Sequence, residues 1–206
     1  MNTAPRSIGE LSAAEIRELV RDKYSEVAFN PSAKYRFRVG HQYAIDVGYP
    51  QPETEGLPKI LTESFTGVSS CLAHIQELEP GEIVLELGSG GGLDTALLAR
   101  KVSPSGKVIG VDLSLAMLQR AATGSKQARI PRVHFSQALA EELPIASNSV
   151  GWVVSNGIFN LSPEKERILG EIHRVLKPKG RVFCSEIVLQ QDPSAEERLN
   201  EDDWFK

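Results

Sequence analysis

The sequence predicts an α/β protein with a doubly wound parallel sheet, and three observations lead to this class. Apolar runs of strand length alternate with helical patterns between residues 83 and 188. Glycines stand at every second position, 88, 90 and 92, directly after the first run. A second run ends in Asp112, about twenty residues past this turn. Strands that alternate with helices favour parallel pairing, right-handed crossovers and helices on both faces, in three layers α/β/α.

The N-terminal part is predicted to cover the sheet rather than to join it. Residues 12–28 form an amphipathic helix, because Ser12 is a candidate N-cap and apolar residues then recur on one face. Residues 30–60 hold four prolines and are predicted to be irregular. We therefore divide the chain into a helix and covering segment at 1–60 and a sheet domain at 61–206.

The first half of the sheet domain follows from its periodicity. A helix is expected at 66–78, ending before a Pro-Gly pair. Residues 83–87 form a buried strand and 93–100 a helix. A second strand follows at 107–112, and a helix at 114–128.

The second half repeats the alternation. Short strands are predicted at 132–136 and 149–155. A proline opens the helix at 163–176, as proline does in a first turn. Residues 177–180 turn the chain into a fifth strand at 181–188. The predicted strand order is 3-2-1-4-5.

The glycine-rich turn predicts a nucleotide site. A strand, a glycine turn and a helix bring backbone N–H groups close to a ligand with no Cβ in the way. The dinucleotide fingerprint needs glycine at the sixth position from Gly88, which is Leu93 here, so NAD fits poorly. Asp112 would accept hydrogen bonds from ribose hydroxyls; alternatively it only precedes the N-cap of the helix near Ser114. Dehydrogenases also carry this acid, so it does not choose the cofactor.

Composition fits one compact unit and excludes several functions. The chain has 206 residues, of which 41% are hydrophobic, and a net charge of −4. This charge gives no long-range attraction to nucleic acid or to an anionic membrane. We see no apolar run long enough to span a bilayer and no secretory signal. The two cysteines lie far apart without metal-ligand spacing, so we expect a cytoplasmic protein with no metal site.

The pattern acid-x-Gly-x-Gly-x-Gly that begins at Glu86 resembles motif I of class I S-adenosylmethionine-dependent methyltransferases. From about residue 15 onward the chain is similar to the arsenite methyltransferase group within this class. The stretches that carry the resemblance are 43–50, 63–68, 86–92, 106–112, 155–163 and 175–180. The resemblance implies a Rossmann-like fold, S-adenosylmethionine as methyl donor, S-adenosylhomocysteine as product and a small-molecule methyl acceptor.

The resemblance also implies a set of site residues. The cofactor-binding residues would be Tyr43, Glu86, Gly88, Ser89, Gly90, Gly92, Asp112, Leu113, Met117, Leu139, Ala140 and Asn156. Tyr43 would cover the pocket, although packing alone would also place an aromatic residue there. Asn156 would hydrogen-bond the methionine portion, or else form a turn before Gly157. No catalytic residue is assigned; His41 is the best candidate for a general base.

The chain departs from the family pattern at the expected thiols. Similar arsenite methyltransferases hold trivalent arsenic with cysteine thiolates, which suit a soft centre. Such a cysteine is expected at position 157, where this chain has Gly157, and another just after Val68. Cys71 is interpreted either as this second thiol, shifted in position, or as a small buried apolar residue, and Cys184 as a small buried apolar residue. One or two scattered thiols cannot surround arsenic. We therefore predict a small-molecule acceptor other than arsenite.

Other departures concern the cofactor and the sheet edge. Ala138 and Leu139 replace a Gly-acid pair near the adenine, and Gly151 replaces a common aspartate. The alternative function is therefore a degenerate or truncated cofactor-binding protein without turnover. We expect the family's C-terminal β-hairpin to be missing from these 206 residues, because only a polar linker and a short helix candidate at 195–206 follow strand five. The exposed edge of strand five would then allow a homodimer.

Overall fold

A computed structural model describes residues 10–75 and 77–188 of the chain. It contains one parallel five-stranded sheet of order β3-β2-β1-β4-β5, which confirms the predicted class and strand order. The strands are β1 (Ile83–Leu87), β2 (Lys107–Asp112), β3 (Val133–Gln137), β4 (Val150–Asn156) and β5 (Leu176–Ser185). The short helix expected at 195–206 lies outside the described residues.

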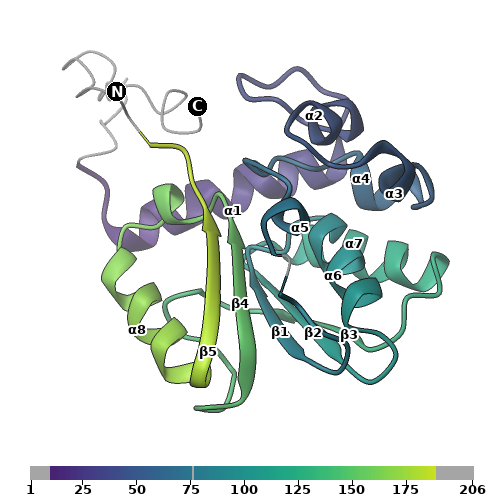
Figure 1. Cartoon of the computed structure of the whole chain (residues 1–206). Coiled ribbons are helices and arrows are strands. Elements are labelled where there is room, and N and C mark those ends of the chain that lie inside the picture. Colours follow the sequence, from purple (N-terminus) through teal and green to yellow (C-terminus); the bar gives the residue numbers. More distant parts are fainter. Residues whose placement is uncertain (1–9, 76, 189–206) are drawn as a thin grey trace, which may run out of the picture.

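Helices cover both faces of the sheet (Figure 1). Along β1, Val84 packs into one apolar cluster with α6, while Leu85 and Leu87 pack into another cluster with α8. This alternation follows from the twofold period of a strand. The helices concerned are α5 (Cys71–His74), α6 (Leu93–Val102), α7 (Leu115–Gln127) and α8 (Lys165–Val175).

Helix α1 (Ala13–Phe29) lies across the carboxyl edge of the sheet (Figure 1). It begins with a capping box, in which Ser12 accepts the Glu15 N–H and Glu15 accepts the Ser12 N–H. The predicted N-terminal helix is therefore confirmed within one residue at each end. Its position matters for function, because ligands of such sheets bind at the carboxyl ends of the strands.

The segment at 30–60 is more regular than predicted. It forms three short helices: α2 (His41–Asp46), α3 (Gln51–Glu55) and α4 (Lys59–Thr62). Pro50 and Pro58 are the N-caps of α3 and α4. The prolines start these helices instead of breaking them, because a proline at a helix start loses no intrahelical hydrogen bond.

The predicted helix at 66–78 is wrong for most of its length. Among the described residues of this range, only α5 is helical, and residues 66–70 are a loop. The amide N–H groups of Val68 and Ser69 donate to the side-chain oxygen of Asn156, at 2.7 and 3.3 Å. A tertiary partner thus holds these N–H groups in place of helical carbonyls.

Two boundaries near the end of the sheet also differ. Helix α8 begins at Lys165 with Glu164 as its N-cap, so Pro163 lies just outside it. The predicted turn at 177–180 is a bulge inside β5, where Val150 pairs with Leu176 but Trp152 pairs with Arg181. The strand ends at residue 185 rather than 188.

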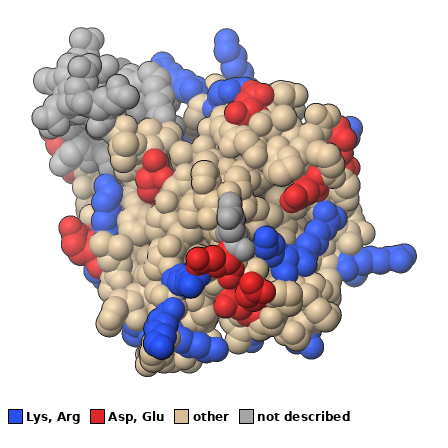
Figure 2. All heavy atoms as spheres, in the orientation of Figure 1, with Lys and Arg blue, Asp and Glu red and all other residues tan. Residues whose placement is uncertain are grey.

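One face of the molecule carries charges of both signs. Figure 2 shows Lys and Arg interspersed with Asp and Glu on the visible face. In the described part of the chain, no helix combines the length and the apolar character that a bilayer crossing demands.

Candidate functional site

A pocket of about 860 Å³, including its open mouth, lies at the carboxyl edge of the sheet. Seven predicted cofactor-binding residues line it: Gly88, Gly90, Asp112, Leu113, Leu139, Ala140 and Asn156. Glu86 and Ser89 line a smaller hollow of about 360 Å³ that shares Gly88, Gly90 and Asn156 with the main pocket. The two hollows therefore adjoin at the glycine turn.

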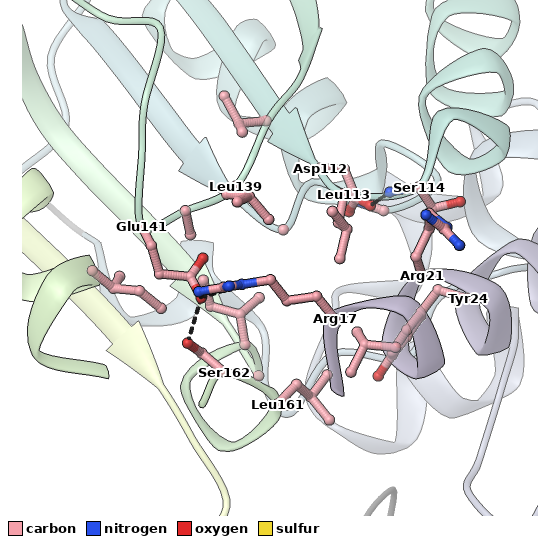
Figure 3. A pocket seen from close by; sticks show the side chains of 18 of the residues that line it. Arg17, Arg21, Tyr24, Asp112, Leu113, Ser114, Leu139, Glu141, Leu161 and Ser162 are labelled. Carbon is pink, nitrogen blue, oxygen red and sulfur yellow. Dashed lines mark hydrogen bonds and ion pairs between the residues drawn. The ribbon is translucent and has the colours of Figure 1, made fainter. Parts of the chain in front are cut away.

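Asp112 ends β2 and points into this pocket region (Figure 3). One carboxylate oxygen accepts the Gly90 N–H and the other accepts the Ser114 N–H, each at 2.8 Å. Burial raises the pKa of Asp112, and the backbone hydrogen bonds oppose that rise. The carboxylate therefore supports the start of α7 and lines the pocket. Its contact with a ribose stays a prediction.

The glycines of the turn have different surroundings. A Cβ on Gly88 would lie 2.2 Å from a methyl carbon of Ile158, whereas a Cβ on Gly90 would meet nothing within 4 Å. Both have positive φ, of 70° and 49°. Because Gly90 lines the pocket and leaves space above its Cα, the turn fits a ligand that approaches the backbone closely. A Cβ on Gly92 would lie 2.8 Å from the Cβ of Ala121, so a glycine is needed here for close packing against α7.

A buried acid pair lies beneath the glycine turn. Glu86 accepts a hydrogen bond from the Thr95 hydroxyl. Asp94 accepts from the Tyr49 hydroxyl and, at 3.0 Å, from the Cys71 thiol. Burial, and then the charge of Asp94, raises the pKa of Glu86 well above its usual value. Sequence reasoning missed Asp94 and Tyr49, because nothing local to them shows that they meet.

Asn156 is at the centre of this network. Its side-chain NH₂ donates to an Asp94 oxygen at 2.9 Å, to the Tyr49 hydroxyl at 3.1 Å and to the Ser69 carbonyl at 2.8 Å. Its side-chain oxygen accepts the two loop N–H groups described above. The amide is thus engaged with the protein itself, and Asn156 positions the pocket wall.

The three remaining cofactor-binding candidates and the candidate base His41 lie away from the lining of either hollow. Tyr43 packs on Phe65, with ring centroids 5.9 Å apart, and lies under Arg38. Met117 packs in an apolar cluster below α1, and Gly92 caps α6. His41, the candidate base, lies 2.9 Å from the Thr54 hydroxyl and outside the lining.

Helix α1 supplies the pocket residues that sequence reasoning missed. Arg17, Val20, Arg21 and Tyr24 line the pocket. Figure 3 shows Arg17, Arg21 and Tyr24 on the α1 side of it. Their spacing of three and four places them on one helix face. The amphipathic pattern gave a signal for a buried face, but it did not show that this face covers a pocket.

Replacing Glu86 by glutamine is expected to flatten the pH dependence of stability. A raised carboxyl pKa in the folded state means that wild-type stability is fully present below the unfolded pKa, about 4.3, and is lost as pH rises through the folded pKa. Glutamine carries no charge to bury. The free energy of unfolding of the variant should therefore increase relative to that of wild type as pH rises, by about 1.4 kcal/mol for each unit by which the folded-state pKa is raised.

Urea unfolding of both proteins between about pH 4 and pH 8 measures this gain. Glu142→Gln, at an exposed acid, is the control and should give a difference that is flat with pH. A flat difference for the Glu86 variant as well would contradict the argument.

Comparison with known proteins agrees with this geometry. A family model described as a methyltransferase domain matches residues 78–204, more than half of the chain. The arsenite methyltransferase of Halobacterium salinarum is 40% identical over 126 residues, which are 57% of this chain and 32% of that protein. A demethylmenaquinone methyltransferase of Lactococcus lactis is 41% identical over 107 residues, 52% of this chain and 42% of that protein.

Solved structures show the same fold. The crystal structure of an arsenic(III) S-adenosylmethionine methyltransferase from Chlamydomonas reinhardtii has a TM-score of 0.55 and 30% identity, over 70% of this chain and 48% of that one. This chain spans less than half the length of each of these three relatives. The cofactor that the family implies is S-adenosylmethionine, with S-adenosylhomocysteine as its product. The chain belongs to the methyltransferase-domain family, as a class I S-adenosylmethionine-dependent member close to the arsenite methyltransferase group.

Proposed function

We propose that the protein transfers a methyl group from S-adenosylmethionine to a small molecule other than arsenite. The observation that carries the proposal is the glycine turn at the carboxyl edge, where Gly90 faces open pocket space and the Asp112 carboxylate lies beside it. Asp112 would hold the ribose, and the backbone at Leu139 and Ala140 would contact the adenine.

The cysteines argue against arsenite. Cys71 is buried, and its thiol donates a hydrogen bond to Asp94. Burial raises the pKa of this thiol well above its usual value. Cys184 is exposed on β5. Neither residue lines the pocket, so the described lining offers no thiolate to a soft arsenic centre. Relatives named as arsenite and as quinone-pathway methyltransferases both match this chain, and this geometry favours an acceptor that needs no thiol.

The residues that line the pocket would act by binding the methyl donor and the acceptor and by orienting them for transfer. When bound, S-adenosylmethionine supplies an activated methyl group on a sulfonium. Positioning the acceptor in line with this group provides much of the acceleration, and the roof made by α1 would exclude water. No histidine or cysteine occurs among the described residues of the lining. Burial raises the pKa of the Tyr24 hydroxyl, so this group is a poor base at neutral pH. The carboxyl groups of the lining, Asp112 and Glu141, are held by backbone N–H groups and by Arg17 and Ser162, so we favour an acceptor whose nucleophilic atom needs no general base.

Two experiments test the proposal. Calorimetry with S-adenosylmethionine, S-adenosylhomocysteine and NAD should show binding of the first two and not of NAD. A labelled-methyl assay with arsenite, hydroxylated aromatic compounds and small amines then tests the acceptor. Transfer to arsenite would overturn its exclusion. Cofactor binding without transfer to any acceptor would favour the alternative, a binding protein without turnover, which the residues at 138, 139 and 151 suggest.

Gly90→Ala is expected to separate ligand binding from folding. The methyl group would enter pocket space, so affinity for S-adenosylhomocysteine should fall about tenfold or more. Positive φ at this position should cost only about 1–2 kcal/mol of stability. Gly170→Ala in α8 is a matched control, because a Cβ there also meets nothing within 4 Å but lies outside the pocket. Calorimetry and thermal melting measure both effects; unchanged affinity in the Gly90 variant would place the ligand elsewhere.

Two further proposals concern the protein's setting. Within the described residues, β5 pairs with β4 on one side and ends the sheet on the other, with Val182 44% exposed. We propose a homodimer along this edge; a strict monomer in sedimentation at high concentration would contradict it.

Both cysteines are unpaired, which suits a reducing compartment such as the cytoplasm.

A further inference from the structure

The two halves of α1 are held in different ways. In the C-terminal half, Val27 and Ala28 are buried against Met117 of α7. The Ser25 and Ser114 hydroxyls are 2.9 Å apart, and the Arg120 guanidinium donates to the Ala28 carbonyl at 2.8 Å. This half is therefore anchored to α7 by apolar packing and by hydrogen bonds.

The N-terminal half has little apolar anchorage. Of residues 13–20, only Ile16 is buried. Arg17 extends from this half across the pocket, toward Glu141 and Ser162 on the far wall (Figure 3). A helix that is packed at one end and tied by a long polar side chain at the other can detach at the tied end, where its turns then fray.

Arg17 joins α1 to two other elements. Its guanidinium Nη2 lies 3.1 Å from a carboxylate oxygen of Glu141, in the connection between β3 and β4, and also pairs with Glu164 at the start of α8. Glu141 accepts a further hydrogen bond from the Ser162 hydroxyl, at 2.9 Å. The side chains of Arg17 and Glu141 are only 19% and 5% exposed. Charge-assisted hydrogen bonds of such limited exposure are stronger than surface ion pairs.

We propose that Arg17 is a positioning residue that latches α1 over the pocket and so sets the rate at which the ligand enters and leaves. Opening would break the pairs with Glu141 and Glu164 while the packing of Val27 and Ala28 acts as the hinge. The inference rests on the proposed function only in taking the ligand to be S-adenosylmethionine or S-adenosylhomocysteine. The latch itself is a property of the protein without ligand.

Hydrogen exchange on the ligand-free chain tests the latch by itself. In Arg17→Gln, backbone amides of residues 17–20 should exchange about tenfold faster than in wild type, which corresponds to the loss of a charge-assisted hydrogen bond. Amides of residues 25–29 should be unchanged. Arg167→Gln is the matched control, because Arg167 also pairs with Glu164 but lies on α8 and does not touch α1.

Ligand release gives the functional readout. S-adenosylhomocysteine, followed by displacement in stopped flow, should leave Arg17→Gln about tenfold faster than wild type or Arg167→Gln. Affinity should change less than the release rate, because opening also speeds entry. Arg17→Lys should restore part of the slow release, because lysine keeps the positive charge but lacks the planar guanidinium that donates several hydrogen bonds at once. Release from wild type should quicken with added salt more than release from Arg17→Gln.

The outcomes distinguish the latch from the proposed function. Glu164→Gln weakens the same pair from the other side, so it replaces Arg17→Gln if thermal melting shows that the latter is unfolded. Wild-type exchange and release rates in these variants would overturn the latch. Faster exchange in a protein that binds neither S-adenosylmethionine nor S-adenosylhomocysteine would support the latch and overturn the proposed function.

Discussion

Asn156→Ala is expected to lower the free energy of unfolding by about 3 kcal/mol or more. The change removes the amide that donates to the buried Asp94 carboxylate and the oxygen that accepts from Val68 and Ser69. Leaving two loop N–H groups unpaired and removing one donor from the buried Asp94 carboxyl group costs more than the hydrogen bonds contribute net, because these groups keep their desolvation penalty. Asp94 keeps the hydrogen bonds from Tyr49 and Cys71. The loop at 66–70 would lose its tie to β4.

Urea unfolding measures this loss. Asn160→Ala is the matched control: it lies four residues later, is exposed and donates to the Ile187 carbonyl. Its cost should stay within about 1 kcal/mol. Equal costs for the two variants would show that the network around Asn156 contributes nothing special to stability.

Asp112→Ala should weaken binding of S-adenosylhomocysteine by about 1–3 kcal/mol, or roughly 5- to 150-fold. The carboxylate would accept the ribose hydroxyls, and it also fixes the Gly90 N–H at the base of the pocket. Its removal therefore takes away a ligand partner and loosens the turn. Thermal melting must accompany the calorimetry, because the Ser114 N–H also loses its acceptor.

Two further variants show whether weaker binding in Asp112→Ala comes from the lost ligand contact or from a destabilised fold. Asp112→Asn keeps an oxygen for one backbone N–H but removes the charge, so a retained melting temperature with weak binding would assign the loss to the ligand contact. Asp46→Ala, which removes an exposed acid paired with Arg38 away from the pocket, should leave affinity unchanged. An unchanged dissociation constant in Asp112→Ala would remove this residue from the site.

The fold was predicted correctly where it depends on the local pattern of residue types in the sequence. Strand order, the glycine turn and the long helices at both faces follow from apolar periodicity and capping residues, which act over a few positions in sequence. The errors occurred where a distant partner decides. The segment at 66–70 is a loop because Asn156 takes its N–H groups, and the turn expected at 177–180 is a bulge because β5 continues its pairing with β4.

The site was predicted less completely for the same reason. The residues that line the pocket from the sheet edge follow strands, so their positions can be read from the strand pattern. Tyr43 was expected to cover the pocket, but Tyr24 lies there, because α1 crosses the carboxyl edge. No local signal in residues 12–28 shows where that helix will pack.

The sequence by itself determined the sheet, the glycine turn, the acid that ends β2 and the family, because each depends on residue types at short, fixed spacings. Only the tertiary structure decided that Tyr49, Asp94 and Asn156 share one buried network and that Arg17 meets Glu141. These contacts join residues far apart along the chain, so they form only when several elements pack together and exclude water from their charges.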